Sequence, residues 1–323
     1  MQGIPTRVLF VNFINYTRCC SRVIERSTLR LGLRILLVLF LGLALESNLF
    51  GVGYTVEGTL TYEATPVPMD QVGEISLPPG SEAHRAEILA ALTNPVTKRS
   101  TFVLRYSDCK WKIDVHPIAD PSFDVYTDDY DGTNILYFFT LLPPKDTNQT
   151  GAVLEPGPVP REYSAGFANC VWLAYASECY FEQIKDGLAV SPQVLTSKSG
   201  HERRFKMPVE FIKSSLPPFL PQAVNYIRTN SPYVLPSGEL DGINLAPPFE
   251  NGYTNYTFRA SGLTNMQGLA FPRSFVFESI APARGAKLPS DLRLVWRLVG
   301  AATNIIVEEP KITHPQQDRR LVV

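Results

Sequence analysis

The sequence predicts an α+β protein, mostly β, built on a large curved antiparallel sheet (half-barrel-like) with one or two packed helices, preceded by an N-terminal signal or anchor helix. Several segments alternate apolar and polar residues, and successive hairpins among them are typical of an antiparallel meander. Only 19% of the 323 residues are charged and 27 are proline, which suits strands joined by long connections. An arginine-rich start followed by a leucine-rich run is typical of an export signal.

The N-terminal segment 1–34 carries six arginines and one glutamate, and the apolar run 35–45 follows it directly. A run of about eleven residues fits a signal peptide, and falls short of the roughly 20 that a spanning helix needs. Cleavage after Gly53 and an uncleaved anchor extending to about Tyr54 both remain open, as do a buried core helix and a true start codon further down the chain. We therefore expect an exported protein of the periplasm or cell envelope, either free or anchored in the cytoplasmic membrane.

This reading divides the chain into a basic cytoplasmic leader (1–34), a signal peptide or transmembrane anchor (35–53), a β-rich exported domain (54–310) and a flexible tail (311–323). Two Pro-rich insertions, 143–162 and 214–250, interrupt the exported domain and are expected to be loops. A division into two domains near 143–160 is the alternative.

The first predicted strand, 54–62, places Tyr54, Val56, Leu60 and Tyr62 on one face. A short helix is expected within 81–92, where apolar residues recur at helical spacing. Two hairpins then follow, 101–115 with Trp111 near its turn, and 123–142 around the Asp131-Gly132 turn.

The longest helix after the leader is predicted over 167–181, from the helical spacing of its aromatic residues. The later strands are expected at 204–212, 253–260, 273–279, 291–299 and 303–308. In 292–298, leucines and Trp296 alternate with arginines, which predicts one buried and one solvated face.

Five cysteines are present, of which Cys109, Cys170 and Cys179 follow the apolar run. We expect these three to be buried thiols, and a Cys170–Cys179 bridge is the less favoured alternative, because nine residues of helix would separate them by about 13 Å. None of the spacings resembles a paired-cysteine metal site, so a structural zinc is not expected.

The hairpin 102–115 with Trp111, followed by Tyr130-Asp-Gly-Thr-Asn-Ile-Leu-Tyr137, resembles the strand and turn arrangement of periplasmic lipoprotein-carrier proteins of the LolA type. The segment Gly268–Pro272, leading into Phe275-Val-Phe277, and a last strand reaching Asn304 resemble the way those chains end. The resemblance covers about half of the mature chain. It implies a half-barrel whose concave apolar face, covered by helices, holds acyl chains or another hydrophobic ligand.

Motifs for catalysis, cofactors and metals are weak. The acidic residues Asp120, Asp124, Asp128, Asp129 and Asp131 suit turns better than a calcium site, which remains the alternative. His116 with Asp114 and Asp120 is the one local pairing that a hydrolase could use. No nucleotide or phosphate-binding glycine motif occurs, so we expect no cofactor and no catalytic residue. The charge balance, 30 basic against 31 acidic residues, disfavours nucleic-acid binding.

The aromatic residues are the better candidates for a site, because they would line one face of a sheet of this size as a packed core or as a ligand cavity. The residues expected to contact a ligand are Trp111, Tyr137, Phe139, Trp172, Tyr175, Phe275, Phe277 and Trp296. The function expected first is therefore an exported or membrane-anchored carrier for a lipid or other hydrophobic ligand. The alternatives are a non-enzymatic structural or protein-interaction component of the envelope that uses its Pro-rich loops to contact a partner, and a hydrolase.

Overall fold

The structure is a computed structural model. It describes residues 53–66, 93–118, 125–141, 149–160, 167–192, 195–196, 202–203, 206–234, 240–243 and 245–312. The chain divides into two compact units, 1–51 and 52–323. All described residues belong to the second unit, and the predicted leader, anchor segment and helix within 81–92 lie outside them, apart from Gly53.

Twelve of the described strands form one antiparallel sheet in the order β6-β5-β4-β3-β2-β1-β16-β15-β14-β11-β10-β7. The strands on one side are β1 (Tyr54–Ala64), β2 (Val96–Ser107), β3 (Lys110–Pro117), β4 (Val125–Tyr130), β5 (Asn134–Leu141) and β6 (Gln149–Pro156). Those on the other side are β16 (Leu292–Ile306), β15 (Leu269–Pro282), β14 (Tyr253–Met266), β11 (Pro221–Arg228), β10 (Lys206–Lys213) and β7 (Leu188–Val190). The remaining described strands pair as β12 (Ser231–Val234) with β13 (Leu240–Ile243), and β8 (Leu195–Thr196) with β9 (Glu202–Arg203).

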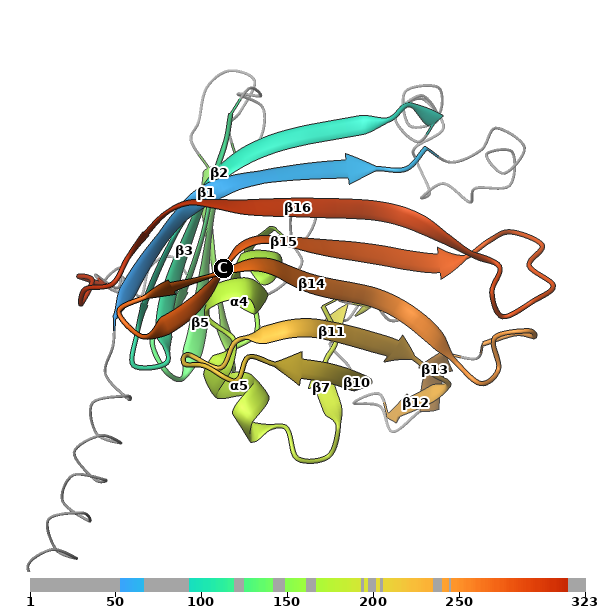
Figure 1. Cartoon of the computed structure of the whole chain (residues 1–323). Coiled ribbons are helices and arrows are strands. Elements are labelled where there is room, and N and C mark those ends of the chain that lie inside the picture. The colour runs from blue at the N-terminus through green and yellow to red at the C-terminus, as the bar shows by residue number, and fades with distance from the viewer. Residues whose placement is uncertain are drawn as a thin grey trace, which may run out of the picture. The chain divides into compact units, whose positions relative to one another are not determined.

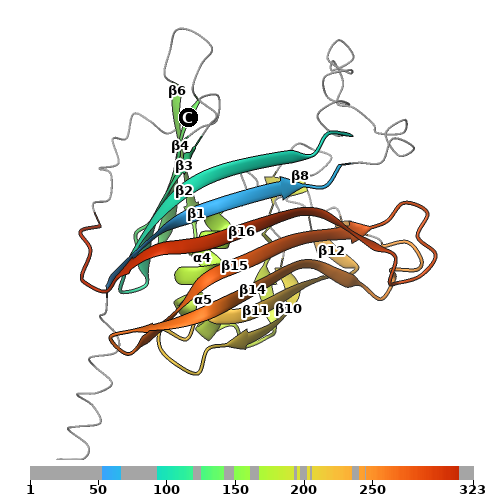
Figure 2. The ribbon, with the colours of Figure 1, turned by 45° about the horizontal axis from the view of Figure 1, so that its top comes forward.

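The sheet is strongly curved, and no described pairing joins its outermost strands β6 and β7 (Figure 1). The first and last strands of the main sheet, β1 and β16, are neighbours at its centre, and a meander extends from each of them (Figure 2). The predicted fold, a curved antiparallel half-barrel with packed helices, is confirmed.

Two helices lie on the concave side of the sheet, α4 (Phe167–Tyr175) and α5 (Glu178–Gln183). All nine residues of α4 are buried, and the helix packs against β2, β3, β11, β15 and β16. A helix that is apolar on all sides is stable only when surrounded by protein. The prediction of one continuous helix over 167–181 is wrong at Ala176–Ser177, where the chain leaves the helix and the Ser177 hydroxyl donates to the Leu173 carbonyl at 2.8 Å.

The Pro-rich segments are not simply loops, as the sequence led us to expect. β6 lies within 143–162, and β11, β12 and β13 lie within 214–250. Pro221 is the first residue of β11 and Pro156 is the last residue of β6, positions where the missing amide donor interrupts little of the ladder. The prediction also divided β16 near Gly300, although this strand runs on to Ile306.

A disulfide joins Cys109 to Cys179, with their Cα atoms 6.0 Å apart, and Cys170 is a buried cysteine that takes no part in a disulfide. The expectation of three thiols is therefore wrong, and so is the alternative Cys170–Cys179 bridge. Cys109 and Asp108 form the β2–β3 turn with positive φ values of 60° and 49°, the conformation of a primed hairpin turn. That turn lies beside the first turn of α5, a long-range proximity that no local pattern reveals.

In the part of the chain that the structure describes, no helix has the length and hydropathy needed to cross a membrane. The segment 35–53 for which an anchor was expected lies almost wholly outside that part.

Candidate functional site: the aromatic interior of the half-barrel

The concave face of the sheet is apolar because alternate residues of each central strand point inward. On β1 these are Tyr54, Val56, Leu60 and Tyr62, as the sequence predicted, and the first three are almost fully buried. The inward residues of β14, β15 and β16 include Phe258, Phe275, Phe277, Trp296 and Leu298, all 9% exposed or less. Together with α4 they form one continuous cluster of buried residues, which we call the aromatic interior.

Two glycines make room for rings in the middle of this interior. A Cβ atom on Gly300 would lie 2.1 Å from Cζ of Phe275, and one on Gly58 would lie 2.4 Å from Cε1 of Phe102. The two rings therefore lie directly over the backbone of β16 and β1. The ring of Tyr175 on α4 packs between them, with centroids 6.0 Å from Phe102 and 5.9 Å from Phe275. The glycines thus allow α4 to approach the sheet closely.

The end of the interior at which β1 begins, the Tyr54 end, is tightly closed. Tyr54 stacks on Tyr106 at 4.7 Å and meets Phe271 edge-on at 4.8 Å. Its hydroxyl donates to the Tyr175 carbonyl, and the Tyr175 hydroxyl donates to the Pro272 carbonyl at 3.0 Å. Burial raises the pKa of the Tyr54 and Tyr175 hydroxyls well above its ordinary value, so both act as neutral donors.

The opposite end, the Trp296 end, is closed by a second group of aromatic rings. Trp296 lies 5.5 Å from Phe277, 5.8 Å from Tyr62 and 6.3 Å from Tyr256, measured between ring centroids. Tyr62 is only half-buried, and it meets Phe167, the first residue of α4, edge-on at 5.9 Å. Exposed fractions of 8% for Phe167 and 9% for Trp296 exceed the values near zero found deeper in the interior.

Seven of the eight residues expected to contact a ligand have described side chains, and all seven belong to the aromatic interior. Trp172 and Tyr175 come from α4, and the others come from β3, β5, β15 and β16. Phe139 lies on β5 opposite Tyr126 in register, and its side chain is outside the described part. The role of these eight residues in ligand binding stays a prediction.

Sequence reasoning did not nominate Tyr62, Tyr226, Tyr256 or Phe167 as site residues, although they complete the Trp296 end. The alternation within 54–62 already placed Tyr62 on the inward face. Tyr226 lies in a segment that its prolines marked as a loop, so no signal in the sequence pointed to it.

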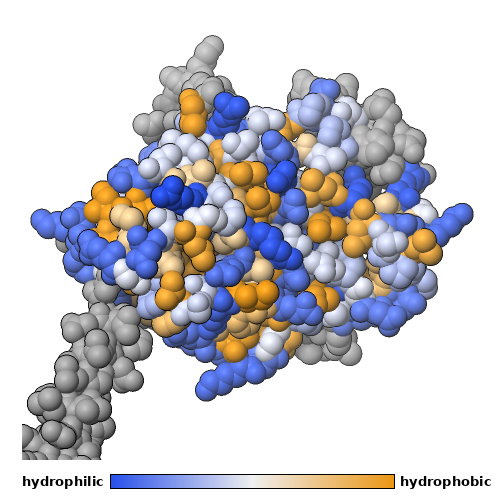
Figure 3. Space-filling model, viewed as in Figure 1, coloured by the Kyte–Doolittle hydropathy of each residue, from blue (hydrophilic) through white to orange (hydrophobic). Residues whose placement is uncertain are grey.

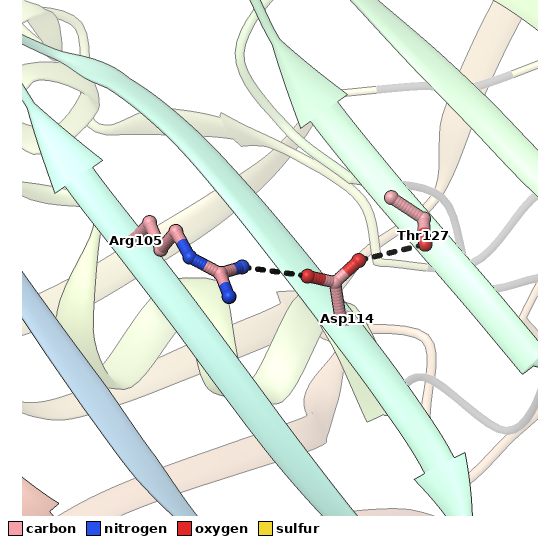
Figure 4. Close-up of polar contacts among 3 residues, drawn as sticks. All are labelled: Arg105, Asp114 and Thr127. Atoms are coloured by element: carbon pink, nitrogen blue, oxygen red, sulfur yellow. Dashed lines mark hydrogen bonds and ion pairs between the residues drawn. The ribbon is translucent and has the colours of Figure 1, made fainter. Parts of the chain in front are cut away.

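The outer, convex face is polar where β2, β3 and β4 cross it. Arg105 donates to Asp114 at 2.8 Å, and the Thr127 hydroxyl donates to the other carboxylate oxygen of Asp114 at 2.8 Å (Figure 4). His116, two residues along β3, is exposed. Asp114, the proposed partner of a catalytic His116, is thus engaged by two other side chains.

The acidic cluster does not converge on one point in the described structure. Asp128 and Asp129 are adjacent on β4 and therefore point to opposite faces of the sheet. The Asp131 carboxylate accepts from the amides of Thr133 and Asn134 at 2.8 and 2.9 Å, which is the turn role that the sequence favoured. Asp120 and Asp124 lie outside the described residues, and within those residues no group of three metal-ligating side chains comes together.

A second polar group lies at the Tyr54 end, where the disulfide meets α5. The Tyr106 hydroxyl donates to Glu178 at 3.5 Å and lies 3.4 Å from the sulfur of Cys179. Burial, with a smaller effect of Glu182, raises the pKa of the Glu178 carboxyl to about 7, although the Tyr106 hydrogen bond and Lys213 act in the opposite direction. Half of these carboxyl groups therefore carry a proton near neutral pH.

Comparisons with known proteins find distant structural likeness. No family model matches the chain, and no curated protein matches it in sequence. A LolA superfamily protein from Nitrosomonas europaea aligns over 79% of this chain and 87% of its own, with 9% identity and a TM-score of 0.33. A domain named as an outer membrane lipoprotein-sorting protein, from Vibrio parahaemolyticus, aligns over 83% and 90%, with 6% identity and a TM-score of 0.36.

A DUF1329 family protein from Desulfovibrio piger aligns over 79% of this chain and 85% of its own, with 9% identity and a TM-score of 0.26. Two of these three structures carry names from the LolA and lipoprotein-sorting group that the sequence was expected to resemble.

Proposed function

We propose that this protein is an exported or membrane-anchored carrier that binds a lipid or another hydrophobic ligand in the aromatic interior, with the Trp296 end as the entrance. The observation that carries the proposal is the ring cluster of Tyr62, Phe167 and Trp296, which joins α4 to β1 and β16. Tyr62 is half-buried, and Phe167 and Trp296 are 8% and 9% exposed, so these rings are less deeply buried than those at the centre of the interior. Rings that can part and repack offer an acyl chain apolar contact without leaving polar groups unpaired.

The polar character of the outside supports an inward-facing site. Figure 3 shows hydrophilic residues between small hydrophobic areas over much of the surface seen from this side. On the convex face, ion pairs and hydrogen bonds such as Arg105–Asp114 and Arg297–Glu278 link neighbouring strands. The buried apolar side chains of the central strands face the concave side and pack with those of α4.

A fluorescent hydrophobic dye tests the proposal on the purified full chain. N-phenyl-1-naphthylamine should bind the folded protein at one site and be displaced by hexadecanoic acid. Tyr62→Ser should weaken dye binding by about tenfold, since a lost ring contact is worth roughly 1–1.5 kcal/mol. Thr61→Ser, on the adjacent residue of β1 that faces outward, is the matched control and should bind as the wild type does.

The opposite result would remove the carrier proposal. If the folded protein binds neither dye nor acid, a non-enzymatic envelope component with a permanently filled core takes its place.

The export part of the proposal rests on the basic segment 1–34 and the apolar run 35–45. Expression in the native host, fractionation and intact-mass analysis test it. A species beginning near Tyr54 in the soluble envelope fraction would indicate a cleaved signal, and an uncleaved species in the membrane fraction would indicate an anchor. An uncleaved species in the cytoplasm contradicts export.

A further inference from the structure

Two arginines lie on the concave face just beyond the aromatic rings of the Trp296 end. In the ladder between β15 and β16, Ser279 pairs with Trp296. Ala281 lies two residues further along β15, on the same face as Ser279, and pairs with Arg293 of β16. On β11, Arg228 follows the buried Tyr226 by two residues and pairs with Tyr253 of β14. Arg228 and Arg293 therefore belong to one transverse row of concave positions, adjacent to the row that contains Tyr226, Tyr256 and Trp296.

The spacing of the strands allows the Arg228 and Arg293 side chains to contact the same anionic group. Three inter-strand steps separate β11 from β16, which is about 14 Å between the two backbones. Because the sheet curves toward α4 (Figure 1), the concave side shortens this separation, and two long arginine side chains can converge across it.

The local environment favours a negative charge at this row. Both arginines are half-buried, and the Nε atom of Arg293 is buried with no hydrogen-bond partner in the described part of the chain. Burial raises the pKa of the Tyr253 hydroxyl, and the nearby Arg228 opposes that rise, which places a positive charge beside the tyrosine. The carboxylate nearest in sequence, Asp291, accepts from the amides of Lys287 and Leu288 at 2.9 and 3.0 Å and so has its own partners.

We infer that the ligand is an anionic amphiphile, with its apolar chain among the rings of the Trp296 end and its carboxylate or phosphate between Arg228 and Arg293. A guanidinium group donates two parallel hydrogen bonds to either anion, and a half-buried position strengthens both bonds relative to water. The inference rests on the proposed function and adds the chemical class of the ligand to it. A neutral amphiphile would leave the buried Arg293 Nε without an acceptor, at a cost in affinity.

Three probes with the same chain length test the inference on the full-length protein, by displacement of N-phenyl-1-naphthylamine. Hexadecanoic acid, hexadecyl phosphate and hexadecanol differ only in the head group. At least one of the two anions should displace the dye at about tenfold lower concentration than the alcohol, and the stronger one identifies carboxylate or phosphate as the preferred head group. Raising the salt concentration should narrow the difference.

Substitutions locate the effect. Arg228→Gln and Arg293→Gln should each weaken binding of the preferred anion by about tenfold and leave hexadecanol unchanged. The matched control is Arg297→Gln. Arg297 lies four residues further along β16 on the convex face, where it contacts Glu278 at 3.6 Å. This variant should bind both the preferred anion and hexadecanol as the wild type does. Thermal unfolding of each variant establishes that the fold is retained.

The outcomes separate this inference from the proposed function. If alcohol and acids bind equally well, or if Arg297→Gln weakens the anion as much as Arg293→Gln does, the anionic site is wrong while the hydrophobic carrier stands. If no probe displaces the dye and the dye itself does not bind, the proposed function fails, and this inference fails with it.

Discussion

Glu178, the first residue of α5, has a half-buried carboxyl group that accepts from the Tyr106 hydroxyl, close to the Cys109–Cys179 disulfide. Its pKa of about 7 in the folded protein exceeds that of an unfolded glutamate, mainly because of burial. A raised carboxyl pKa means that the folded state holds the proton more tightly, so unfolding becomes easier as pH rises from about 4.5 to 7 and then levels off.

Glu178→Gln should remove this pH dependence. The glutamine keeps an oxygen for the Tyr106 hydroxyl and carries no charge, so the variant should be more stable than the wild type at pH 8 by up to about 3 kcal/mol. At pH 4 the free energies of unfolding of the wild type and the variant should be nearly equal. Urea unfolding across this pH range measures the difference, and parallel curves for the two proteins would contradict the assigned burial.

Gly300 provides the space for a ring at the centre of the interior. Gly300→Ala should lower the free energy of unfolding by about 1–3 kcal/mol, because the new methyl group would overlap the buried ring of Phe275. In a Phe275→Leu background the same change should cost less, since the smaller side chain leaves room. Additive losses in the double variant would show that the ring contact is not the cause.

Inward-facing residues such as Tyr54 and Trp296 could be predicted from alternation alone, because one buried face imposes a period of two. The contacts between these residues could not. Tyr54 meets Tyr175 across 121 residues of chain, and Cys109 meets Cys179 across 70. Such pairings depend on how the strands curve around α4, which no local pattern records.

Among the elements, α5 is held by a single covalent link to the β2–β3 turn. Replacing Cys109 and Cys179 together by serine should lower the free energy of unfolding by about 2–4 kcal/mol, because the unfolded chain has more conformational freedom without the cross-link. Adding dithiothreitol to the wild type should produce a similar loss and should leave the double variant unchanged. A wild type that is indifferent to the reductant would contradict a disulfide between α5 and the β2–β3 turn.

Strand prediction worked best in the hairpins β2–β3 and β4–β5, each of which has a short turn between its strands. It was incomplete in β14 and β15, because the predicted strands ended at 260 and resumed at 273, whereas β14 runs to Met266 and β15 begins at Leu269. It failed in the Pro-rich segments, because prolines there mark strand ends, as at Pro156 and Pro221, and do not exclude the strands between them. The single predicted helix divides into α4 and α5 because the spacing of apolar residues continues past Ser177, whereas the backbone turns there to bring Cys179 toward β2.

In the second unit, two meanders meet at β1 and β16 and curve around an apolar helix. This arrangement concentrates the aromatic rings on one side and ion pairs on the other. It also places the rings of the Trp296 end beside Arg228 and Arg293, so one end of the half-barrel offers both an apolar and a cationic environment. The central claim is that an apolar chain enters the interior at that end.

Photo-crosslinking with a diazirine-bearing hexadecanoic acid tests the claim most directly on the purified full chain. We predict that labelled peptides map to α4, β14 and β16, around Phe167, Tyr256 and Trp296, and that unlabelled hexadecanoic acid suppresses the labelling. Labelling confined to the convex face, or labelling that the unlabelled acid does not reduce, would contradict the account.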